Sequence, residues 1–365
     1  MSTSAASPAL AALHQHGQSP WLDFIHRQLI QSGELSQWIA RGVRGLTSNP
    51  AIFDKALASG SYDSAIARAM AEGLDSQGIY EQLAIEDIRA AADAFLPLHQ
   101  ASAAEDGWVS LEVSPLLAHD SASTVLEARR LWRAVDRPNL MIKVPGTPAG
   151  LQVLRQLISE GISVNVTLLF AVDAYVEVVE AWMQGLEARS TSGASLAGVA
   201  SVASFFISRI DAVVDAALAD TPLRSLSGKV AMANAAQAYG HLQGLMSGAR
   251  WQRLQQQGAS VQRLLWASTG TKNPAYAETM YVEGLIAAHT VNTMPPATLQ
   301  AFVREGRVRP SLEPLLPEAD ALLRQLSGQG IDLQAITTRL QQEGIAQFEQ
   351  SFAALLARIE SRRVA

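Results

Sequence analysis

The sequence predicts an α/β fold, a (β/α)8 TIM barrel with extra C-terminal helices, because strand-like runs alternate with helical patterns along one undivided chain. Eight such units fit within 365 residues, which favours a closed barrel. No linker rich in Pro, Gly or charge divides the chain, so residues 20–365 are expected to form a single domain that includes the C-terminal helices. Residues 1–19 show no clear period and are expected to be a flexible N-terminus.

The expected strands are short apolar runs, and the segments between them carry apolar residues near a 3.6-residue spacing, most clearly at residues 79–95 and 171–186. Beyond the last strand, two apolar stripes separated at Gly344 predict helices packed on the barrel, with a partner-binding helix as the alternative. The strand candidates, in chain order, are residues 21–25, 43–47, 109–114, 140–145, 162–168, 199–206, 264–268 and 290–293.

The composition excludes several classes of partner. With 28 Lys and Arg against 34 Asp and Glu, the net charge is −6 and no basic cluster is present, so nucleic acid is not an expected partner. The absence of cysteine excludes disulfides, thiol nucleophiles and cysteine-based metal centres. The longest uncharged run, residues 190–208, is diluted by Ser, Thr and Gly, so no membrane span is expected. The start of the chain lacks a signal-peptide pattern, and a cytoplasmic protein is the expectation.

Polar residues alternate with apolar ones in several strands that should be buried on both faces. Strands of a parallel sheet are usually continuously apolar, so this alternation is informative. Helices cover the outside of a barrel, which directs the apolar face outward and the polar face toward the barrel axis. The residues gathered there are Asp23, Glu112, Lys143, Asn165 and Thr167. The alternative is an antiparallel sheet with one wet face, which the regular helical segments between the strands disfavour.

A lysine among acids inside a barrel suggests a specific chemistry. Desolvation disfavours the ammonium form, and the free amine of Lys143 could add to a carbonyl substrate to form a Schiff base. Asp23 and Glu112 could then transfer the protons that iminium formation and C–C cleavage require. The alternative is that Lys143 belongs to a structural ion pair. No zinc-protease, hydrolase or nucleotide-binding motif occurs, and no metal site is expected.

At these residues the sequence resembles the transaldolase family, the Schiff-base enzymes of the non-oxidative pentose phosphate pathway. Residues 45–53 (GLTSNPAIF) resemble the first family signature, and residues 141–151 (MIKVPGTPAGL) resemble the signature that carries the Schiff-base lysine. Residues 163–168 (SVNVTL) and 21–23 (WLD) match two further catalytic strands. The match covers nearly the whole chain, and its length resembles that of the longer bacterial members.

The resemblance implies transfer of a dihydroxyacetone unit from sedoheptulose 7-phosphate or fructose 6-phosphate to glyceraldehyde 3-phosphate or erythrose 4-phosphate. Lys143 would form the Schiff base with the ketose C2, and Asp23 would take the proton from the C4 hydroxyl. Glu112 and Thr167 would hold the water that carries protons while the carbinolamine forms and collapses. No cofactor is implied, because the lysine itself supplies the electron sink.

The implied partners are phosphorylated ketose and aldose sugars, and a monomer or homodimer is expected. Asn49 and Asn165 would hydrogen-bond the hydroxyls of the dihydroxyacetone unit. Thr47 would support the loop that carries Asn49.

The resemblance also implies a phosphate site. Ser204 and Arg209 match a strand whose arginine binds the substrate phosphate, and Ser268 matches a serine near the same place. Gly270 stands where shorter relatives carry a second phosphate-binding arginine, and Lys272 is the expected substitute.

Two other functions stay open at this point. An aldolase of the fructose-6-phosphate aldolase branch would release free dihydroxyacetone without needing an aldose acceptor. A non-catalytic sugar-phosphate-binding protein would be expected to have lost Lys143, Asp23 or Glu112, and all three are present.

Overall fold

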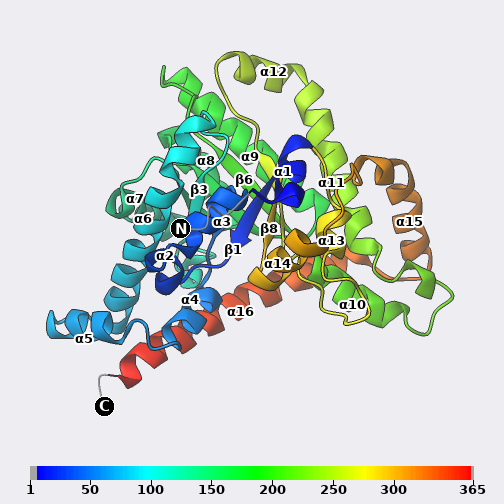
Figure 1. The fold of residues 1–365 in the computed structure, drawn as a ribbon. Coiled ribbons are helices and arrows are strands. Elements are labelled where there is room, and N and C mark those ends of the chain that lie inside the picture. The colour runs from blue at the N-terminus through cyan, green and yellow to red at the C-terminus, as the bar shows by residue number, and fades with distance from the viewer. Residues whose placement is uncertain (1–5, 363–365) are drawn as a thin grey trace.

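The structure, a computed structural model, describes residues 6–362. It confirms the predicted barrel, because eight strands pair in parallel in sequence order and β1 closes on β8 (Figure 1). The strands are β1 (Gln18–Asp23), β2 (Gly45–Thr47), β3 (Trp108–Glu112), β4 (Leu140–Pro145), β5 (Val164–Leu169), β6 (Ser201–Phe206), β7 (Arg263–Ala267) and β8 (Thr290–Met294). Each overlaps one of the eight candidates, with ends shifted by a few residues.

Helices surround the barrel, and the first turns of those that follow β2 and β4 carry sequence signals for a helix start. Asn49 caps the helix that begins at Pro50, and Thr147 caps the one that begins at Pro148, where proline's fixed φ suits the first turn. The helices are α1 (Pro8–Gln15), α2 (Arg27–Gln31), α3 (Glu34–Arg41), α4 (Pro50–Leu57), α5 (Asp63–Ala71), α6 (Ser76–Ala101), α7 (Ser121–Val135), α8 (Pro148–Glu160), α9 (Val172–Thr191), α10 (Ser208–Leu218), α11 (Val230–Ser247), α12 (Ala249–Gln256), α13 (Met280–Glu283), α14 (Pro296–Glu305), α15 (Leu316–Gly328) and α16 (Leu333–Ser361).

The beginning of the chain differs from the flexible N-terminus expected for residues 1–19. Residues 1–5 lie outside the described part, but α1 is an ordered helix and β1 begins at Gln18. The Ser7 hydroxyl caps α1, and the side chains of Leu10 and Leu13 are fully buried. In the sequence, two leucines among alanines are too short a pattern to indicate a helix. In the structure, the same two leucines anchor α1 to the barrel.

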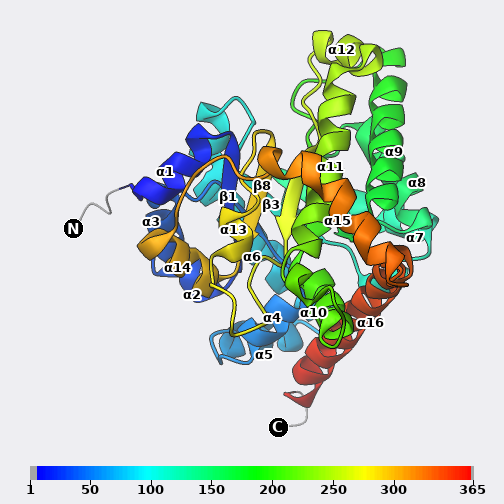
Figure 2. The ribbon, with the colours of Figure 1, turned by 90° about the vertical axis from the view of Figure 1, so that its right-hand side faces the viewer.

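The end of the chain forms the extra helices that the sequence predicts, and Figure 2 shows α15 beside α11 and α16 beside α10. Helix α16 runs past α4 and α10 (Figure 1) without a break at Gly344, where the apolar pattern is interrupted. A Cβ atom added at Gly344 would lie 3.0 Å from Leu168 Cδ2. The glycine therefore marks a close approach of α16 to the barrel rather than a helix end. Within residues 6–362, no helix combines the length and apolar character needed to cross a bilayer.

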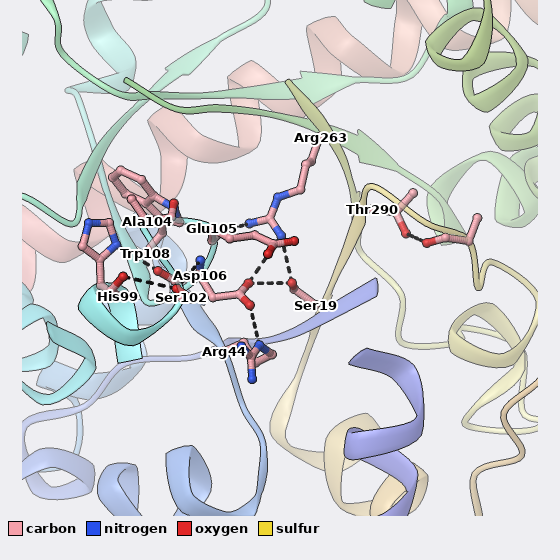
Figure 3. A network of polar contacts seen from close by, with 11 residues as sticks. Ser19, Arg44, His99, Ser102, Ala104, Glu105, Asp106, Trp108, Arg263 and Thr290 are labelled. Atoms are coloured by element: carbon pink, nitrogen blue, oxygen red, sulfur yellow. Dashed lines mark hydrogen bonds and ion pairs between the residues drawn. The ribbon is translucent and has the colours of Figure 1, made fainter. Parts of the chain in front are cut away.

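An ionic network closes the barrel at the N-terminal ends of its strands (Figure 3). The carboxylate of Asp106, which is fully buried, accepts hydrogen bonds from Ser19 Oγ at 2.6 Å, from Arg263 Nη1 at 3.3 Å and from Arg44 Nε. Burial alone would raise the pKa of Asp106, but Arg263 and Arg44 outweigh it and hold that pKa below its usual value. Barrel enzymes carry their active sites at the opposite end, where the strands have their C-terminal ends. The network at the N-terminal ends therefore stabilises the fold.

Candidate active site

A cavity of about 500 Å³ opens at the C-terminal ends of the strands. Of the eleven residues that the sequence nominated, nine line it: Asp23, Thr47, Asn49, Lys143, Thr167, Ser204, Arg209, Ser268 and Lys272. The other two, Glu112 and Asn165, lie behind this lining and hydrogen-bond to residues in it. The C-terminal ends of the strands are where barrel enzymes build their active sites.

Lys143 lies on β4, and its side chain is almost entirely buried. Its Nζ atom donates to Ser48 O at 3.1 Å and to Glu112 Oε2 at 3.3 Å, and it lies 5.6 Å from the ring centroid of Phe348. Burial raises the pKa of Glu112 to about 7, although the charge of Lys143 and its hydrogen bond act in the opposite direction. Glu112 can therefore hold or release a proton near neutral pH, directly beside the amine.

Asp23 is the last residue of β1 and faces the same cavity. Burial raises its pKa, while the charge of Lys143 and a hydrogen bond from Thr47 Oγ1, 2.7 Å from Asp23 Oδ1, act against the rise. Thr47 Oγ1 also lies 2.8 Å from Thr293 Oγ1. The hydroxyl of Thr47 thus orients Asp23, and the support of the Asn49 loop implied by the resemblance stays a prediction.

Thr167 sits where β5 departs from a regular strand. The pairing of β5 with β6 shifts register after Val166, and Leu168 has a φ of +62°. The bulge leaves Thr167 Oγ1 buried, and this hydroxyl has no hydrogen-bond partner among residues 6–362. A buried hydroxyl without a partner beside a cavity is available to hold a water molecule or a substrate hydroxyl.

The two asparagines and Ser204 occupy different layers of the site. Asn49 Oδ1 accepts from Ile52 N at 3.0 Å as the N-cap of α4, so the amide is held at the cavity wall. Asn165 Oδ1 accepts from Ser204 Oγ at 2.7 Å, and Asn165 Nδ2 donates to Ser110 Oγ at 3.1 Å. Asn165 is therefore engaged with neighbouring strands, and Ser204 stands between it and the cavity.

Three cationic side chains besides that of Lys143 line the cavity. Arg209, on α10, donates from Nη1 to Gln347 Oε1 at 2.7 Å, and burial lowers its pKa. Lys272 lies on the exposed loop after β7, and Ser268 Oγ lies 3.0 Å from Ser208 Oγ. Lys55, on α4, also lines the cavity. Several positive charges facing one cavity favour an anionic ligand such as a phosphate.

The sequence reasoning missed several residues of this site. Lys55 lies two residues after the 45–53 signature and could have been found there. Thr293 lies on the last strand candidate, residues 290–293, in which Thr290, Asn292 and Thr293 are polar. Phe348 and Gln347 come from α16, and its apolar stripe predicted packing without indicating which strand ends it would meet. Within residues 6–362, His, Asp and Glu side chains form no group of three that could hold a metal ion.

Comparisons with known proteins agree with this geometry. The family model of transaldolase and fructose-6-phosphate aldolase matches residues 20–359. A transaldolase of Thiobacillus denitrificans is 49% identical over 94% of this chain and 97% of its own length. A transaldolase of Neisseria gonorrhoeae is 46% identical over 93% of this chain and 96% of its own length. The transaldolase 2 of Nostoc punctiforme is 44% identical over 97% of each chain.

Proposed function

We infer that this chain, which belongs to the transaldolase/fructose-6-phosphate aldolase family, uses Lys143 as the Schiff-base amine of a transaldolase reaction. Family membership makes it an enzyme, a transferase whose substrates are phosphorylated sugars. The observation that carries the proposal is the buried pair of Lys143 and Glu112, 3.3 Å apart, in a cavity shared with Asp23. An amine, an acid that can carry a proton and a carboxylate base are the groups that Schiff-base aldol chemistry needs.

The first half of the proposed reaction forms the imine. The amine of Lys143 adds to the C2 carbonyl of the ketose phosphate and gives a carbinolamine. Glu112 supplies a proton to the C2 hydroxyl, which leaves as water, and the nitrogen lone pair forms the iminium. The free hydroxyl of Thr167 supports the proposal that a water molecule is held there to carry this proton.

The second half breaks and remakes a C–C bond. Asp23 takes the proton of the C4 hydroxyl, the C3–C4 bond breaks, and its electron pair passes into the iminium to form an enamine. The C4 fragment leaves as an aldose phosphate. The enamine then attacks the aldehyde carbon of the acceptor, Asp23 returns its proton to the new hydroxyl, and water releases the product from Lys143. The raised pKa of Asp23 makes its carboxylate a stronger base for this step.

Borohydride reduction in the presence of fructose 6-phosphate tests the proposal. The chain has only four lysines, and three of them, Lys55, Lys143 and Lys272, line the cavity, so peptide mapping distinguishes them. The label is expected on Lys143 and should disappear in Lys143→Met. Lys143→Arg should be inactive as well, because a guanidinium stays protonated and cannot add to a ketone. Lys229→Met, which changes an exposed lysine outside the cavity, is the matched control. A label on another lysine would reject the assignment.

The same preparation separates transfer from simple aldol cleavage. A transaldolase turns over fructose 6-phosphate rapidly only with an aldose acceptor such as erythrose 4-phosphate. Rapid release of free dihydroxyacetone without acceptor would instead support the fructose-6-phosphate aldolase alternative. The curated relatives carry the transaldolase name, which supports the transfer reaction. The assembly, a monomer or homodimer, stays a prediction that analytical ultracentrifugation of the full chain tests.

A further inference from the structure

We propose that Gln341, on helix α16, is a positioning residue that fixes the ends of the two strands carrying Lys143 and Thr167. This inference rests on the proposed function of those two residues. The side-chain amide of Gln341 donates from Nε2 to Gly146 O at 3.0 Å and to Leu168 O at 3.2 Å. Gly146 follows the end of β4, and Leu168 directly follows Thr167 on β5.

The two strand ends meet at the point where Gln341 bridges them. Gly146 N donates to Thr167 O at 2.7 Å, so the backbones of β4 and β5 are already joined there. Gln341 joins two neighbouring carbonyls, that of Gly146 directly after β4 and that of Leu168 near the end of β5. One side chain from a distant helix therefore sets the spacing between the strand ends that hold the amine and the free hydroxyl.

The backbone at Leu168 requires such a partner. Its φ of +62° lies in the left-handed region, which residues with a side chain seldom adopt, and the ladder with β6 is out of register there. Backbone in this region persists only where its surroundings hold it. The hydrogen bond from Gln341 satisfies the Leu168 carbonyl and holds the bulge in which Thr167 Oγ1 lies buried without a protein partner beside the cavity.

The sequence of α16 is suited to this contact. Gln341, Gly344 and Phe348 follow one another at spacings of three and four, so they share one face of the helix. Gly344 is buried and lets the helix approach Leu168 closely, and the ring of Phe348 lies 5.6 Å from Lys143 Nζ. Gln341 is partly buried, whereas the next residue, Gln342, is exposed. On the face of α16 toward the barrel, Gly344 allows close packing, Gln341 donates the hydrogen bonds, and Phe348 covers Lys143.

This arrangement makes Gln341 important for the imine-forming step rather than for binding of the sugar phosphate. Losing the bridge would let the bulge relax and displace Thr167, and with it the proposed proton-carrying water. Misplacing a reacting group by about 1 Å can slow a reaction by about 100-fold. Arg209 hydrogen-bonds Gln347 rather than Gln341, so Arg209 and Lys272, which also line the cavity, should hold the phosphate as before.

The test compares Gln341→Met, which keeps the length of the side chain but removes the donor, with Gln342→Met as the matched control. We measure kcat, KM for fructose 6-phosphate, the rate of borohydride-trapped imine formation in a single turnover, and the thermal midpoint. We expect Gln341→Met to lower kcat and the trapping rate at least about tenfold, with KM within about twofold of the parent. Gln342→Met should match the parent in all four measurements.

A second variant covers the case in which Gln341→Met does not fold. Gln341→Asn keeps the amide but is one methylene too short to reach both carbonyls, and it should show the same loss. Three outcomes would overturn the inference. The folded variants could lose less than about tenfold in kcat, a rise in KM could account for the loss in kcat/KM, or both variants could fail to fold. Labelling of Lys143 in the parent is scored separately, so failure of the proposed function is distinguished from failure of this inference.

Discussion

Glu112 and Lys143 are register partners on neighbouring parallel strands, and their side chains meet at 3.3 Å inside the barrel. Parallel pairing places register partners side by side, and both side chains point to the barrel interior because the next residues along each strand face the helices. The pair is buried together, so the charge of each depends on the other. The raised pKa of Glu112 follows from this shared burial.

The pKa of about 7 for Glu112 predicts a pH dependence of imine formation. As the donor of a proton to the leaving hydroxyl, Glu112 must be protonated, and the protonated fraction falls as the pH rises through about 7. The rate of borohydride trapping should therefore decline above this pH. In Glu112→Gln the rate should be low and this decline absent. Glu72→Gln, at an exposed carboxyl, serves as the control, and an unchanged decline in Glu112→Gln would contradict the role.

Asp23→Ala should separate imine formation from C–C cleavage. Because Asp23 is assigned to the C4 hydroxyl, its loss leaves the amine free to form the Schiff base but removes the base for the next step. Loss of a general base lowers a rate by about 10²- to 10⁴-fold. Borohydride labelling of Lys143 should persist, while release of glyceraldehyde 3-phosphate from fructose 6-phosphate falls by that factor. Near-parental release would mean that Asp23 is structural, and Glu112 would then be the first candidate for the base.

The sequence predicted the barrel and its inward-facing polar set because both depend on the alternation of side chains along buried strands. Helices cover the outer face of the barrel, so a polar residue such as Lys143 in an otherwise apolar strand points toward the barrel interior. The eight strands and the inward direction of the polar set therefore followed from spacing alone. The roles suggested for individual residues came from the resemblance, and they stay proposals.

Other features could not be predicted from the sequence because they depend on contacts between distant segments. The periodicity of α16 indicates an apolar face, but it does not say that Gln341 meets the bulge at Leu168 or that Phe348 covers Lys143. Thr47 was placed in the site, but its partner Asp23 is set by the register of β1 with β2. The helix α1 was missed because its stability comes from the barrel surface that buries its leucines.

Asp106→Asn should destabilise the fold without changing the chemistry. The variant leaves the buried charge of Arg263 without this carboxylate. Breaking a buried ion pair in this way lowers the free energy of unfolding by about 3–5 kcal/mol. Because the folded pKa of Asp106 is lowered, its contribution is fully present above the unfolded value of about 4 and is lost as the pH falls through the folded pKa. Urea denaturation should show the full difference at pH 7 and a smaller one below pH 4.

The matched control for this prediction is Asp93→Asn, which removes an exposed partner of Arg137. Surface ion pairs contribute about 0–1 kcal/mol, so Asp93→Asn should change little. Turnover per folded molecule should be parental in both variants, since the network lies at the end of the barrel opposite the cavity. A loss below about 1 kcal/mol in Asp106→Asn would contradict the stabilising role of the buried charge.

Arg209 and Lys272 should bind the phosphate with unequal strength. Arg209 is partly buried and its planar guanidinium can bind a phosphate through two hydrogen bonds, each worth about 1.5–3 kcal/mol when charged. Lys272 is exposed on its loop, where a charge pair contributes about 0.2–1 kcal/mol. Arg209→Ala should therefore raise KM for fructose 6-phosphate by at least about tenfold, and Lys272→Ala by no more than about fivefold.

Unphosphorylated fructose is the comparison that assigns these losses to the phosphate. Neither variant should change its KM by more than about twofold, because fructose lacks the phosphate that Arg209 and Lys272 are proposed to bind. Lys229→Ala, which removes an exposed lysine outside the cavity, should leave both constants at parental values. Arg209 also donates to Gln347 of α16, and a phosphate that binds Arg209 must share or replace this contact. Equal losses on both sugars would mean that Arg209 acts by anchoring α16, and the phosphate would then be bound by other residues of the cavity.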